Sequence, residues 1–348
     1  MSDQAEPMHE QTEAGELMRA QGLTRHFRLG GVGSKQVLHA VDDIDLTIGE
    51  REIVALVGES GSGKSTVARL LARIYTPTAG EIHYRGRPLS KLRSRRDLLW
   101  YRSEVAMVFQ DPFSAFNPVH RIAHGVMRNL TLHRRELSGD ERKREAERVC
   151  ESVGLSPRLL SRYPYEMSGG ERQRIGFAQA LALQPKLILA DEPVSMLDVS
   201  IRAGVLNMMA GLRDREGVSL LYITHDLASA RYVADRIVVM YAGEIVEAGP
   251  TETVLSSPKH PYTRLLLSAV ADPRDGESEF SADTGEPPRV INPEPGCRFR
   301  FRCPYAIDIC QTVTPRPTPI GAAMVACHVA AAEAERDATS AGASSPMS

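Results

Sequence analysis

The chain has 348 residues, of which 42% are hydrophobic and 25% are charged, and its formal net charge is −2. These proportions are those of an ordinary globular protein, and the small net charge provides no basic field for nucleic acid, so we expect no nucleic acid partner. No uninterrupted apolar run approaches the ~20 residues that a membrane-spanning helix needs. The polar, acidic N-terminus is also unlike a secretory signal. We therefore expect a cytoplasmic protein that reaches a membrane only by binding another protein.

Composition divides the chain into five stretches. Two polar tails, 1–16 and 330–348, contain too little apolar surface to offset the entropy of ordering them, so both are predicted to be disordered. A stretch rich in Pro and Gly, 271–295, is typical of a linker. It separates a large body, 17–270, from a small cysteine-bearing segment, 296–329.

Within the body, strand patterns alternate with helical patterns. Ile44, Leu46 and Ile48 alternate with polar residues, as in a strand with one face in water. Short continuous apolar runs are typical of strands buried on both faces, and they occur at 53–57, 187–190 and 220–223. Helical patterns occur between them, for example at 142–153 and 173–183. This alternation predicts an α/β fold with a largely parallel sheet.

Residues 58–66, Gly-Glu-Ser-Gly-Ser-Gly-Lys-Ser-Thr, match the phosphate-binding pattern G-x-x-x-x-G-K-[ST]. The match follows the apolar run 53–57 and precedes the helical pattern 67–73, which is the context that the pattern requires. Its glycines let backbone N–H groups surround phosphate oxygens, and the helix N-terminus adds a positive dipole end. Lys64 is expected at the β- and γ-phosphates of ATP, and Ser65 at Mg²⁺. The residues expected to bind the nucleotide here are Gly58, Ser60, Gly61, Gly63, Lys64, Ser65 and Thr66.

Two acidic residues, Asp191 and Glu192, directly follow the apolar run 187–190. Ligands bind at the carboxyl ends of strands in open α/β sheets, so these carboxylates are placed for chemistry. We expect Asp191 to hold Mg²⁺ and Glu192 to act as general base on the attacking water. Alone, two acids after a strand are usually a solvated strand end. With the phosphate loop, they indicate a P-loop nucleotide-binding protein, without deciding which class.

The segment Met167-Ser168-Gly169-Gly170-Glu171 resembles the LSGGQ signature of the ABC ATPase family. Ser168 is a good helix N-cap, and the two glycines allow the backbone to approach a phosphate closely. The resemblance implies that these residues complete the ATP site of an opposite subunit. Glu171 stands where the commonest signature has Gln, which leaves the contacts of this side chain open.

Four other residues match further ABC motifs in chain order. Gln110 resembles the Q-loop glutamine, Asp198 in Ser-Met-Leu-Asp resembles the D-loop with Met replacing Ala, and His225 resembles the switch histidine at the γ-phosphate. Phe27 lies where the family stacks an aromatic ring on adenine, although an aromatic residue in an N-terminal strand can also be part of the core. The resemblance thus implies two overlapping sets of residues. The catalytic residues would be Lys64, Gln110, Glu192 and His225, and the magnesium ligands would be Ser65, Gln110 and Asp191.

Longer segments narrow the resemblance to the ATPases of oligopeptide and dipeptide importers, and to the second of the two ATPases that such importers often carry. These segments are 58–66, 109–118, His260-Pro261-Tyr262-Thr263 and 296–305. The resemblance implies an ABC ATPase core with a mixed sheet, an antiparallel β subdomain, a helical signature subdomain at about 111–175 and a small cysteine-rich extension.

The resemblance also implies partners. Two membrane permeases would contact the segment after Gln110, about 111–130, at the cytoplasmic face of the membrane. A second ABC ATPase would form a heterodimer, or a second copy a homodimer, and an extracytoplasmic binding protein would deliver the cargo. Nickel, glutathione and oligosaccharide importers share these motifs, so cargoes other than peptides stay open.

Two alternative classes fit less well. Non-transport ABC ATPases of DNA repair insert long coiled coils, whereas the span between Lys64 and Ser168 holds only a helical subdomain, and those of translation usually carry two ATPase units. A P-loop small-molecule kinase would lack 168–171 and His225.

Four of the five cysteines lie in one short segment, with the spacing C-x5-C-x6-C-x16-C: Cys297, Cys303, Cys310 and Cys327. This is not the paired C-x2-C spacing of common zinc sites, and a cytoplasmic location disfavours disulfides. The segment is poor in aliphatic residues, so a metal centre would supply stability that its core lacks. Some members of the importer family carry a [4Fe–4S] cluster there, while zinc and a metal-free thiol cluster are the alternatives. ATP binding is expected to be independent of these cysteines, because the phosphate loop belongs to a separate core.

Overall fold

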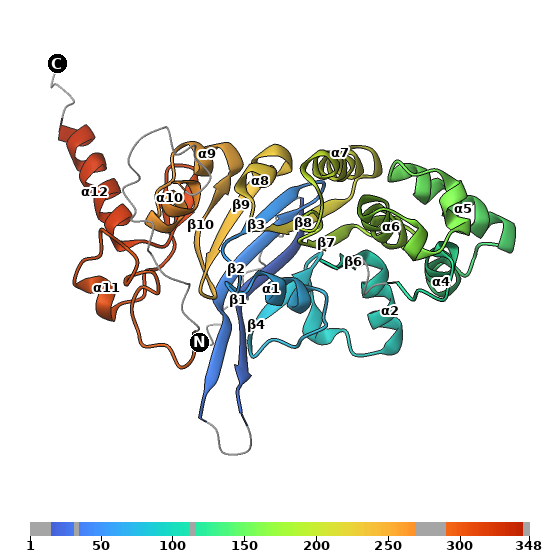
Figure 1. The fold of residues 1–348 in the computed structure, drawn as a ribbon. Coiled ribbons are helices and arrows are strands. Elements are labelled where there is room, and N and C mark those ends of the chain that lie inside the picture. Colours follow the sequence, from blue (N-terminus) through green and yellow to red (C-terminus); the bar gives the residue numbers. More distant parts are fainter. Residues whose placement is uncertain (1–14, 31–34, 112–115, 269–289, 344–348) are drawn as a thin grey trace, which may run out of the picture.

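The computed structural model describes residues 15–30, 35–111, 116–268 and 290–343. These residues form two sheets with helices packed against them (Figure 1). The strands of a four-stranded antiparallel sheet, in the order β2-β1-β4-β5, are β1 (Glu16–Arg28), β2 (Val37–Gly49), β4 (Ala79–Tyr84) and β5 (Arg87–Pro88).

The second sheet has eight described strands in the order β11-β12-β10-β9-β3-β8-β7-β6. They are β3 (Ile53–Val57), β6 (Val105–Val108), β7 (Leu187–Asp191), β8 (Ser219–Thr224), β9 (Arg236–Tyr241), β10 (Glu244–Pro250), β11 (Thr318–Ile320) and β12 (Ala323–Val325). The five strands from β9 to β6 are parallel, and β10, β12 and β11 continue the sheet antiparallel. The expected α/β class with a mixed sheet and an antiparallel β subdomain is confirmed.

The helices connect and cover these strands. They are α1 (Lys64–Leu71), α2 (Arg95–Glu104), α4 (Ile122–His133), α5 (Gly139–Ser152), α6 (Gly169–Leu181), α7 (Val199–Glu216), α8 (Leu227–Val233), α9 (Thr251–Ser256), α10 (Pro261–Ser268), α11 (Ile309–Thr312) and α12 (His328–Ala343). Within the described residues, no helix combines the length and the apolarity that crossing a bilayer requires.

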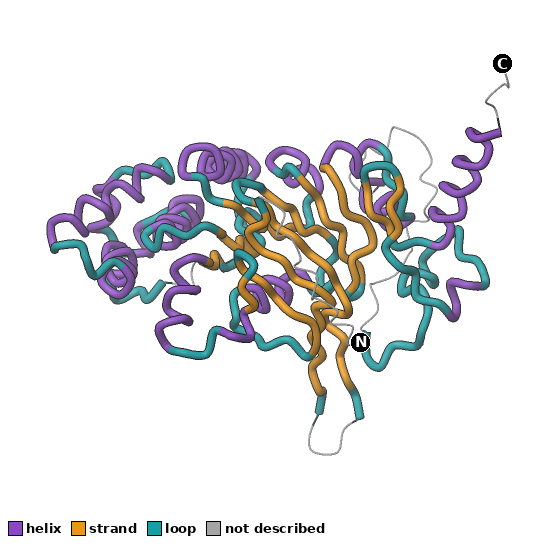
Figure 2. Tube along the Cα trace, turned by 180° about the vertical axis from the view of Figure 1, so that it is seen from behind, coloured by secondary structure: helices purple, strands orange, loops and turns teal. Residues whose placement is uncertain are grey.

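The large sheet has a hydrophobic core on each face. Figure 2 shows the strands in the middle of the molecule with helices beside them, from the side opposite to Figure 1. The two cores explain the continuous apolar run of β3, since Ile53, Ala55 and Val57 join one core while Val54 and Leu56 join the other. Helix α1 and the antiparallel sheet close one core, and α6, α7 and α8 close the other. The central strands are therefore held rigidly from both sides, which fixes the positions of the loops at their ends.

Helices α4, α5 and α6 lie together at one end of the molecule (Figure 1). Helix α5 begins three residues before the predicted pattern because Ser138 caps it. The Ser138 hydroxyl accepts from Glu141 N at 3.3 Å, and the Glu141 carboxylate accepts from Ser138 N at 2.7 Å. This reciprocal capping box satisfies two otherwise unpaired donors at the start of the helix.

The C-terminal region departs from the prediction in three ways. First, the cysteine-bearing segment extends the main sheet, because β12 pairs with β10 and Val325 is fully buried in the main core. Second, the end of the predicted linker is paired with β2, since His39 N donates to Val290 O at 2.8 Å and Asn292 N to Val37 O at 2.9 Å. The predicted linker residues 271–289 lie outside the described residues.

Third, the prediction of a disordered tail over 330–348 is wrong for 330–343, which belong to helix α12. Alanine, glutamate and arginine are strong helix formers, and the prediction considered only the lack of large apolar side chains. At the other end, β1 already begins at Glu16, and the predicted tail residues 1–14 lie outside the described residues.

Candidate nucleotide site

The site lies at the carboxyl ends of four adjacent parallel strands, β3, β8, β7 and β6. The phosphate loop follows β3, His225 follows β8, Asp191 ends β7 and Gln110 follows β6. Parallel neighbouring strands end at the same edge of a sheet. Segments that are far apart in the sequence therefore meet at one edge.

The phosphate loop closes around the Lys64 ammonium. The Lys64 side chain is buried, and its Nζ donates to the carbonyls of Gly58 and Glu59, both at 2.7 Å. A side chain at Gly58 would place Cβ 2.1 Å from Met240 O, and one at Gly63 would place it 2.2 Å from Ala40 O. Both positions also have positive φ, so only glycine fits them.

Burial lowers the pKa of Lys64 to about 8, against the opposing negative charges of Glu192, Asp191 and Glu59. Loss of hydration disfavours the charged form of the Lys64 ammonium, and an anionic ligand beside it would favour that charged form again.

Ser65 and Asp191 are adjacent at the start of α1. The Ser65 hydroxyl donates to Asp191 Oδ1 at 2.8 Å, and Asp191 is only 3% exposed. Burial raises the pKa of Asp191, while the Ser65 hydrogen bond opposes the rise. A hydroxyl and a buried carboxylate side by side are the hard oxygen ligands that Mg²⁺ prefers.

The Glu192 carboxylate lies between the side chains from two other strands. Gln110 Nε2 donates to Glu192 Oε2 at 3.0 Å, and His225 Nδ1 lies 3.5 Å from Glu192 Oε1. The Glu192 backbone has φ +46 and its N–H donates to Ile223 O at 3.0 Å. A non-glycine residue held at positive φ often marks a functional site, because the surrounding structure must compensate for the strain.

The signature segment forms the N-terminus of α6. Ser168 Oγ accepts from Glu171 N at 3.3 Å, and Glu171 Oε2 accepts from Ser168 N at 2.8 Å. This backbone hydrogen bond lowers the pKa of Glu171, so its carboxylate is engaged in capping its own helix. A Cβ at Gly170 would approach Ile201 Cγ2 to 2.4 Å, so the second glycine also lets α6 pack against α7. Among the described residues, no hydrogen bond or ion pair joins 168–171 to the phosphate loop of the same chain.

The segment that resembles the D-loop, which includes Asp198, lies at the surface of the protein. Asp198 is exposed at the N-cap of α7, where its carbonyl accepts from Ile201 N and Arg202 N, both at 3.0 Å. Its neighbours Met196 and Val199 are 61% and 79% exposed. Two large apolar side chains therefore lie exposed on either side of Asp198.

Phe27 lies on β1 and is not one of the buried core residues. Its ring meets Tyr75 edge-on at a centroid distance of 5.4 Å, and the Arg25 guanidinium lies 4.5 Å from its centroid. The core alternative considered for Phe27 therefore does not hold, and its ring is partly accessible.

The four C-terminal cysteines are gathered in the fold and none forms a disulfide. Burial raises the pKa of Cys297 to about 12 and that of Cys303 to about 11, and the negative charges of the other cysteines of the group add to both shifts. Cys297 N also donates to Cys310 O at 2.9 Å. Buried thiols with raised pKa values lose their protons readily only when a cation binds them, and four cysteines gathered together are a donor set that fits a thiolate-ligated metal centre.

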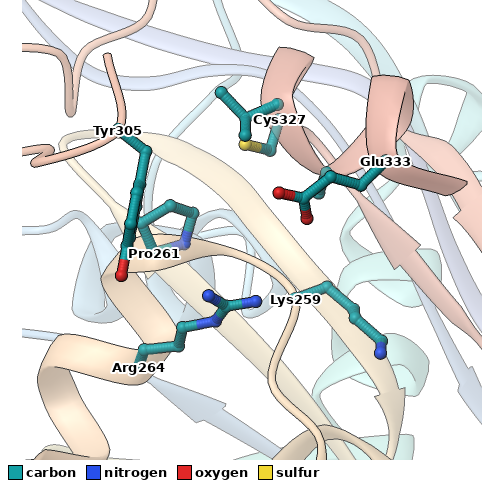
Figure 3. A pocket seen from close by; sticks show the side chains of 8 residues that line it. Lys259, Pro261, Arg264, Tyr305, Cys327 and Glu333 are labelled. Carbon is teal, nitrogen blue, oxygen red and sulfur yellow. The ribbon is translucent and has the colours of Figure 1, made fainter.

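No three of the cysteine sulfurs lie within 4.8 Å of one another in the described residues. Within the described part of the chain, the sole group of three ligand atoms within 4.8 Å of one another is His26, His39 and Asp42. Cys327 also lines a cavity of about 30 Å³, opposite Lys259 and Arg264 (Figure 3).

No pattern in the sequence indicated the group of His26, His39 and Asp42. His26 Nε2 lies 2.9 Å from Asp42 Oδ1 and His39 Nδ1 lies 2.8 Å from Asp42 Oδ2, and Arg298 also donates to this carboxylate. With both carboxylate oxygens already hydrogen-bonded, the group reads as a network that ties β1 and β2 to the cysteine-bearing segment.

The expectation that the phosphate loop belongs to a core separate from the cysteine segment is also wrong. Arg302 of that segment pairs with Glu59 of the loop at 2.7 Å and 2.9 Å. No pattern within the sequence connects these two residues, which lie 243 positions apart.

The fold and the site define the P-loop class of nucleotide-binding proteins with an ABC-type cassette. Residues 41–195 match the family model described as ABC transporter, and residues 246–310 match the model described as oligopeptide/dipeptide transporter, C-terminal region. The chain is 43% identical over 323 residues to a probable peptide ABC transporter ATP-binding protein, y4tS, of Sinorhizobium fredii, covering 90% of each chain. It is 40% identical over 318 residues to a putative oligopeptide transport ATP-binding protein, YkfD, of Bacillus subtilis, covering 90% of this chain and 95% of the relative.

Among solved structures, the ATP-binding cassette MJ0796 in a dimeric post-hydrolysis state bound to ADP and Pi matches with a TM-score of 0.61 at 27% identity. The match covers 68% of this chain and 99% of that one. The chain belongs to the ABC transporter ATPases, in the branch that carries the oligopeptide/dipeptide transporter C-terminal region.

Proposed function

We propose that this chain is the ATP-hydrolysing subunit of an ABC importer that carries oligopeptides or dipeptides across the cytoplasmic membrane. The observation that carries the ATPase role is the single edge where Lys64, Ser65, Asp191 and Glu192 meet. The peptide cargo rests on the relatives described as peptide transport ATP-binding proteins, which align with nine-tenths of the chain.

The arrangement supports an in-line attack of water on the γ-phosphate. On nucleotide binding, Lys64 Nζ would exchange the Gly58 and Glu59 carbonyls for the β- and γ-phosphate oxygens. Ser65 and Asp191 would hold Mg²⁺, which supplies neutralising charge at the phosphates. Glu192 would take the proton of the attacking water, with Gln110 and His225 orienting its carboxylate.

The proposal includes partner proteins. Within the described residues, the signature segment makes no hydrogen bond or ion pair with its own phosphate loop, and we propose that a second ATPase chain supplies the signature that closes this site. We propose a heterodimer with a sister ATPase, with a homodimer as the alternative. Exposed Phe109, at 44%, lies just before the segment 111–130 that is proposed to dock on a permease, and exposed Val119, at 69%, lies within it. Residues 112–115 of this segment lie outside the described residues. Two permeases and an extracytoplasmic binding protein would complete the importer, with this chain at the cytoplasmic face of the membrane.

The function is tested in proteoliposomes that contain the complex purified through this chain. We expect ATP hydrolysis to rise when the binding protein is supplied with di- or oligopeptides, with accumulation of labelled peptide inside the vesicles. Stimulation only by nickel, glutathione or an oligosaccharide would reassign the cargo. Purification without any membrane protein, together with crosslinks from 116–130 solely to soluble proteins, would contradict the importer.

We further propose that Cys297, Cys303, Cys310 and Cys327 hold a [4Fe–4S] cluster. The proposal rests on the gathering of the four cysteines, because Cys297 interacts electrostatically with the other three, and on the suitability of four thiolate ligands for such a cluster. The cluster would stabilise a segment that has few aliphatic side chains of its own.

Anaerobically purified protein is expected to be brown and to contain about four iron and about four sulfide per chain. Replacing Cys310 by Ser should remove most of the iron, whereas Cys150→Ser should not, because Cys150 is buried in α5 away from this group. Zinc without iron would support the zinc alternative. A colourless, metal-free protein that is still folded through residue 329 would contradict any metal centre.

A further inference from the structure

Glu59 of the phosphate loop is held at three points. Its backbone N–H donates to Tyr262 Oη at 2.9 Å, and its carbonyl accepts from Lys64 Nζ at 2.7 Å. Its carboxylate accepts two hydrogen bonds from Arg302, Nη1 to Oε2 at 2.7 Å and Nη2 to Oε1 at 2.9 Å. Two of the three partners thus come from the C-terminal part of the chain, outside the strands that form the nucleotide site.

Arg302 is rigidly placed for this contact. Its side chain is only 8% exposed, and the two-pronged pairing fixes the plane of the guanidinium. The guanidinium lies 5.7 Å from the Tyr241 ring and 5.9 Å from the Phe299 ring, while Tyr241 and Tyr262 pack at a centroid distance of 4.5 Å. These aromatic side chains are buried, so they restrict the positions that the Arg302 guanidinium can take.

The turn that carries Tyr262 is equally constrained. Buried Glu247 accepts from the backbone N–H groups of Lys259 and His260, at 2.8 Å and 3.0 Å, and His260 Nδ1 accepts from Tyr262 N at 3.0 Å. Burial lowers the pKa of His260 to about 3, which keeps the ring neutral and able to accept this bond. The His-Pro-Tyr-Thr motif therefore fixes the position of Tyr262, whose hydroxyl accepts a hydrogen bond from the backbone of the phosphate loop.

The negative charge of Glu59 acts on the Lys64 ammonium, which is the group proposed to bind phosphate. Its carboxylate interacts with Lys64, as do Asp191 and Glu192. A nucleotide brings several negative charges to the same ammonium, and an unpaired carboxylate on the loop would repel them. Arg302 supplies the compensating positive charge from a residue directly before Cys303.

We propose that Arg302 is a positioning residue for ATP, which neutralises Glu59 and fixes the first turn of the phosphate loop. Through this contact, the cysteine-bearing segment forms part of the nucleotide site and sets the affinity of the site for MgATP. The inference deepens the ATPase role and rests on it, because it assumes that the loop binds MgATP.

The test compares MgATP affinity in the full chain and its variants. Arg302→Ala is expected to raise the Kd for MgATP about tenfold, because one uncompensated charge remains on a partly buried loop. Once ATP is saturating, kcat should change less than about threefold, because Glu192 and its partners are untouched. Adding Glu59→Gln to Arg302→Ala should restore most of the lost affinity, since the repelling charge is then gone.

The matched control is Arg300→Ala. Arg300 is also 8% exposed in the same segment, but it bonds to Cys297 O and faces Glu294, and none of its described contacts reaches the phosphate loop. Arg300→Ala should therefore bind MgATP as the wild type does. Should Arg302→Ala not fold, Arg302→Lys provides the comparison, because it keeps the charge and loses the two-pronged geometry.

Two outcomes would overturn the inference. One is wild-type affinity in Arg302→Ala. The other is a double variant that binds as weakly as Arg302→Ala alone, since Arg302 would then act by supporting the fold and not through Glu59. Failure of the wild-type chain to bind MgATP would instead count against the proposed ATPase role, so the two failures are distinguishable.

Discussion

Glu192→Gln is expected to bind MgATP with wild-type affinity and to hydrolyse it roughly 10²–10⁴-fold more slowly. The amide has nearly the same shape as the carboxylate but cannot accept the proton of the attacking water. Lys64, Ser65 and Asp191 remain in place to hold the nucleotide. The measurement is steady-state phosphate release by the assembled complex, paired with nucleotide binding by the same variant.

This variant should also accumulate as an ATP-bound dimer, visible as a shift in size-exclusion elution when MgATP is present. Glu252→Gln is a suitable control, because Glu252 pairs with Arg231 on the surface outside the site. Phosphate release at the wild-type rate by Glu192→Gln, measured with its partners, would remove Glu192 from the role of general base.

Lys64→Ala is expected to weaken MgATP binding by about 100-fold, because the variant loses the charge-assisted hydrogen bonds that the buried ammonium would make to phosphate. Without its side chain, the loop also loses the cation that its Gly58 and Glu59 carbonyls surround. Direct titration calorimetry with MgATP measures the change. Affinity within threefold of the wild type would contradict the placement of the phosphates at Lys64.

The pH dependence provides a sharper test of the same group. The pKa of Lys64 is lowered to about 8 by burial, so the ammonium is charged below this pH and loses its proton above it. Phosphate binding favours the charged form, so binding takes up a proton above about pH 8. The affinity for MgATP should therefore fall by up to about tenfold per pH unit between about pH 8 and about pH 9.5. Lys64→Arg keeps its charge over this range, and its affinity, although weaker, should not follow this fall. A wild-type Kd that does not change over this range would contradict the assigned titration.

The contiguous parts of the site could be predicted because their conformation depends on neighbouring residues. Glycines that alone permit positive φ, a run of apolar residues before them and a helix start after them define the phosphate loop locally. The cap of α6 is local in the same way, since Ser168 and Glu171 bond across three residues. Even there, only the structure shows that Glu171 caps its own helix.

The predictions for the C-terminal region were wrong for two reasons: one local rule was used without helix propensity, and the other contacts join segments that are distant in the sequence. Absence of large apolar residues suggested disorder in 330–343, whereas helix propensity alone favours α12 there. The cysteine segment looked independent because a linker precedes it, yet it adds β12 to the edge of the main sheet next to β10. Edge strands expose unpaired backbone groups, and a distant segment can satisfy them without any local signal.

The sequence by itself determined which chemical groups this protein presents: a phosphate loop, two carboxylates after a strand, a capped glycine pair and four clustered cysteines. These depend on residue type and short spacing, for which hydrogen bonds and backbone dihedrals between near neighbours are sufficient. The tertiary structure alone decided which of these groups meet. The order β3-β8-β7-β6 brings Gln110 and His225 to the two sides of Glu192, and the segment that joins the edge of the sheet through β12 also places Arg302 against Glu59. Contacts of this kind follow from the burial of whole sheet faces, which is a property of the complete chain and of no single segment.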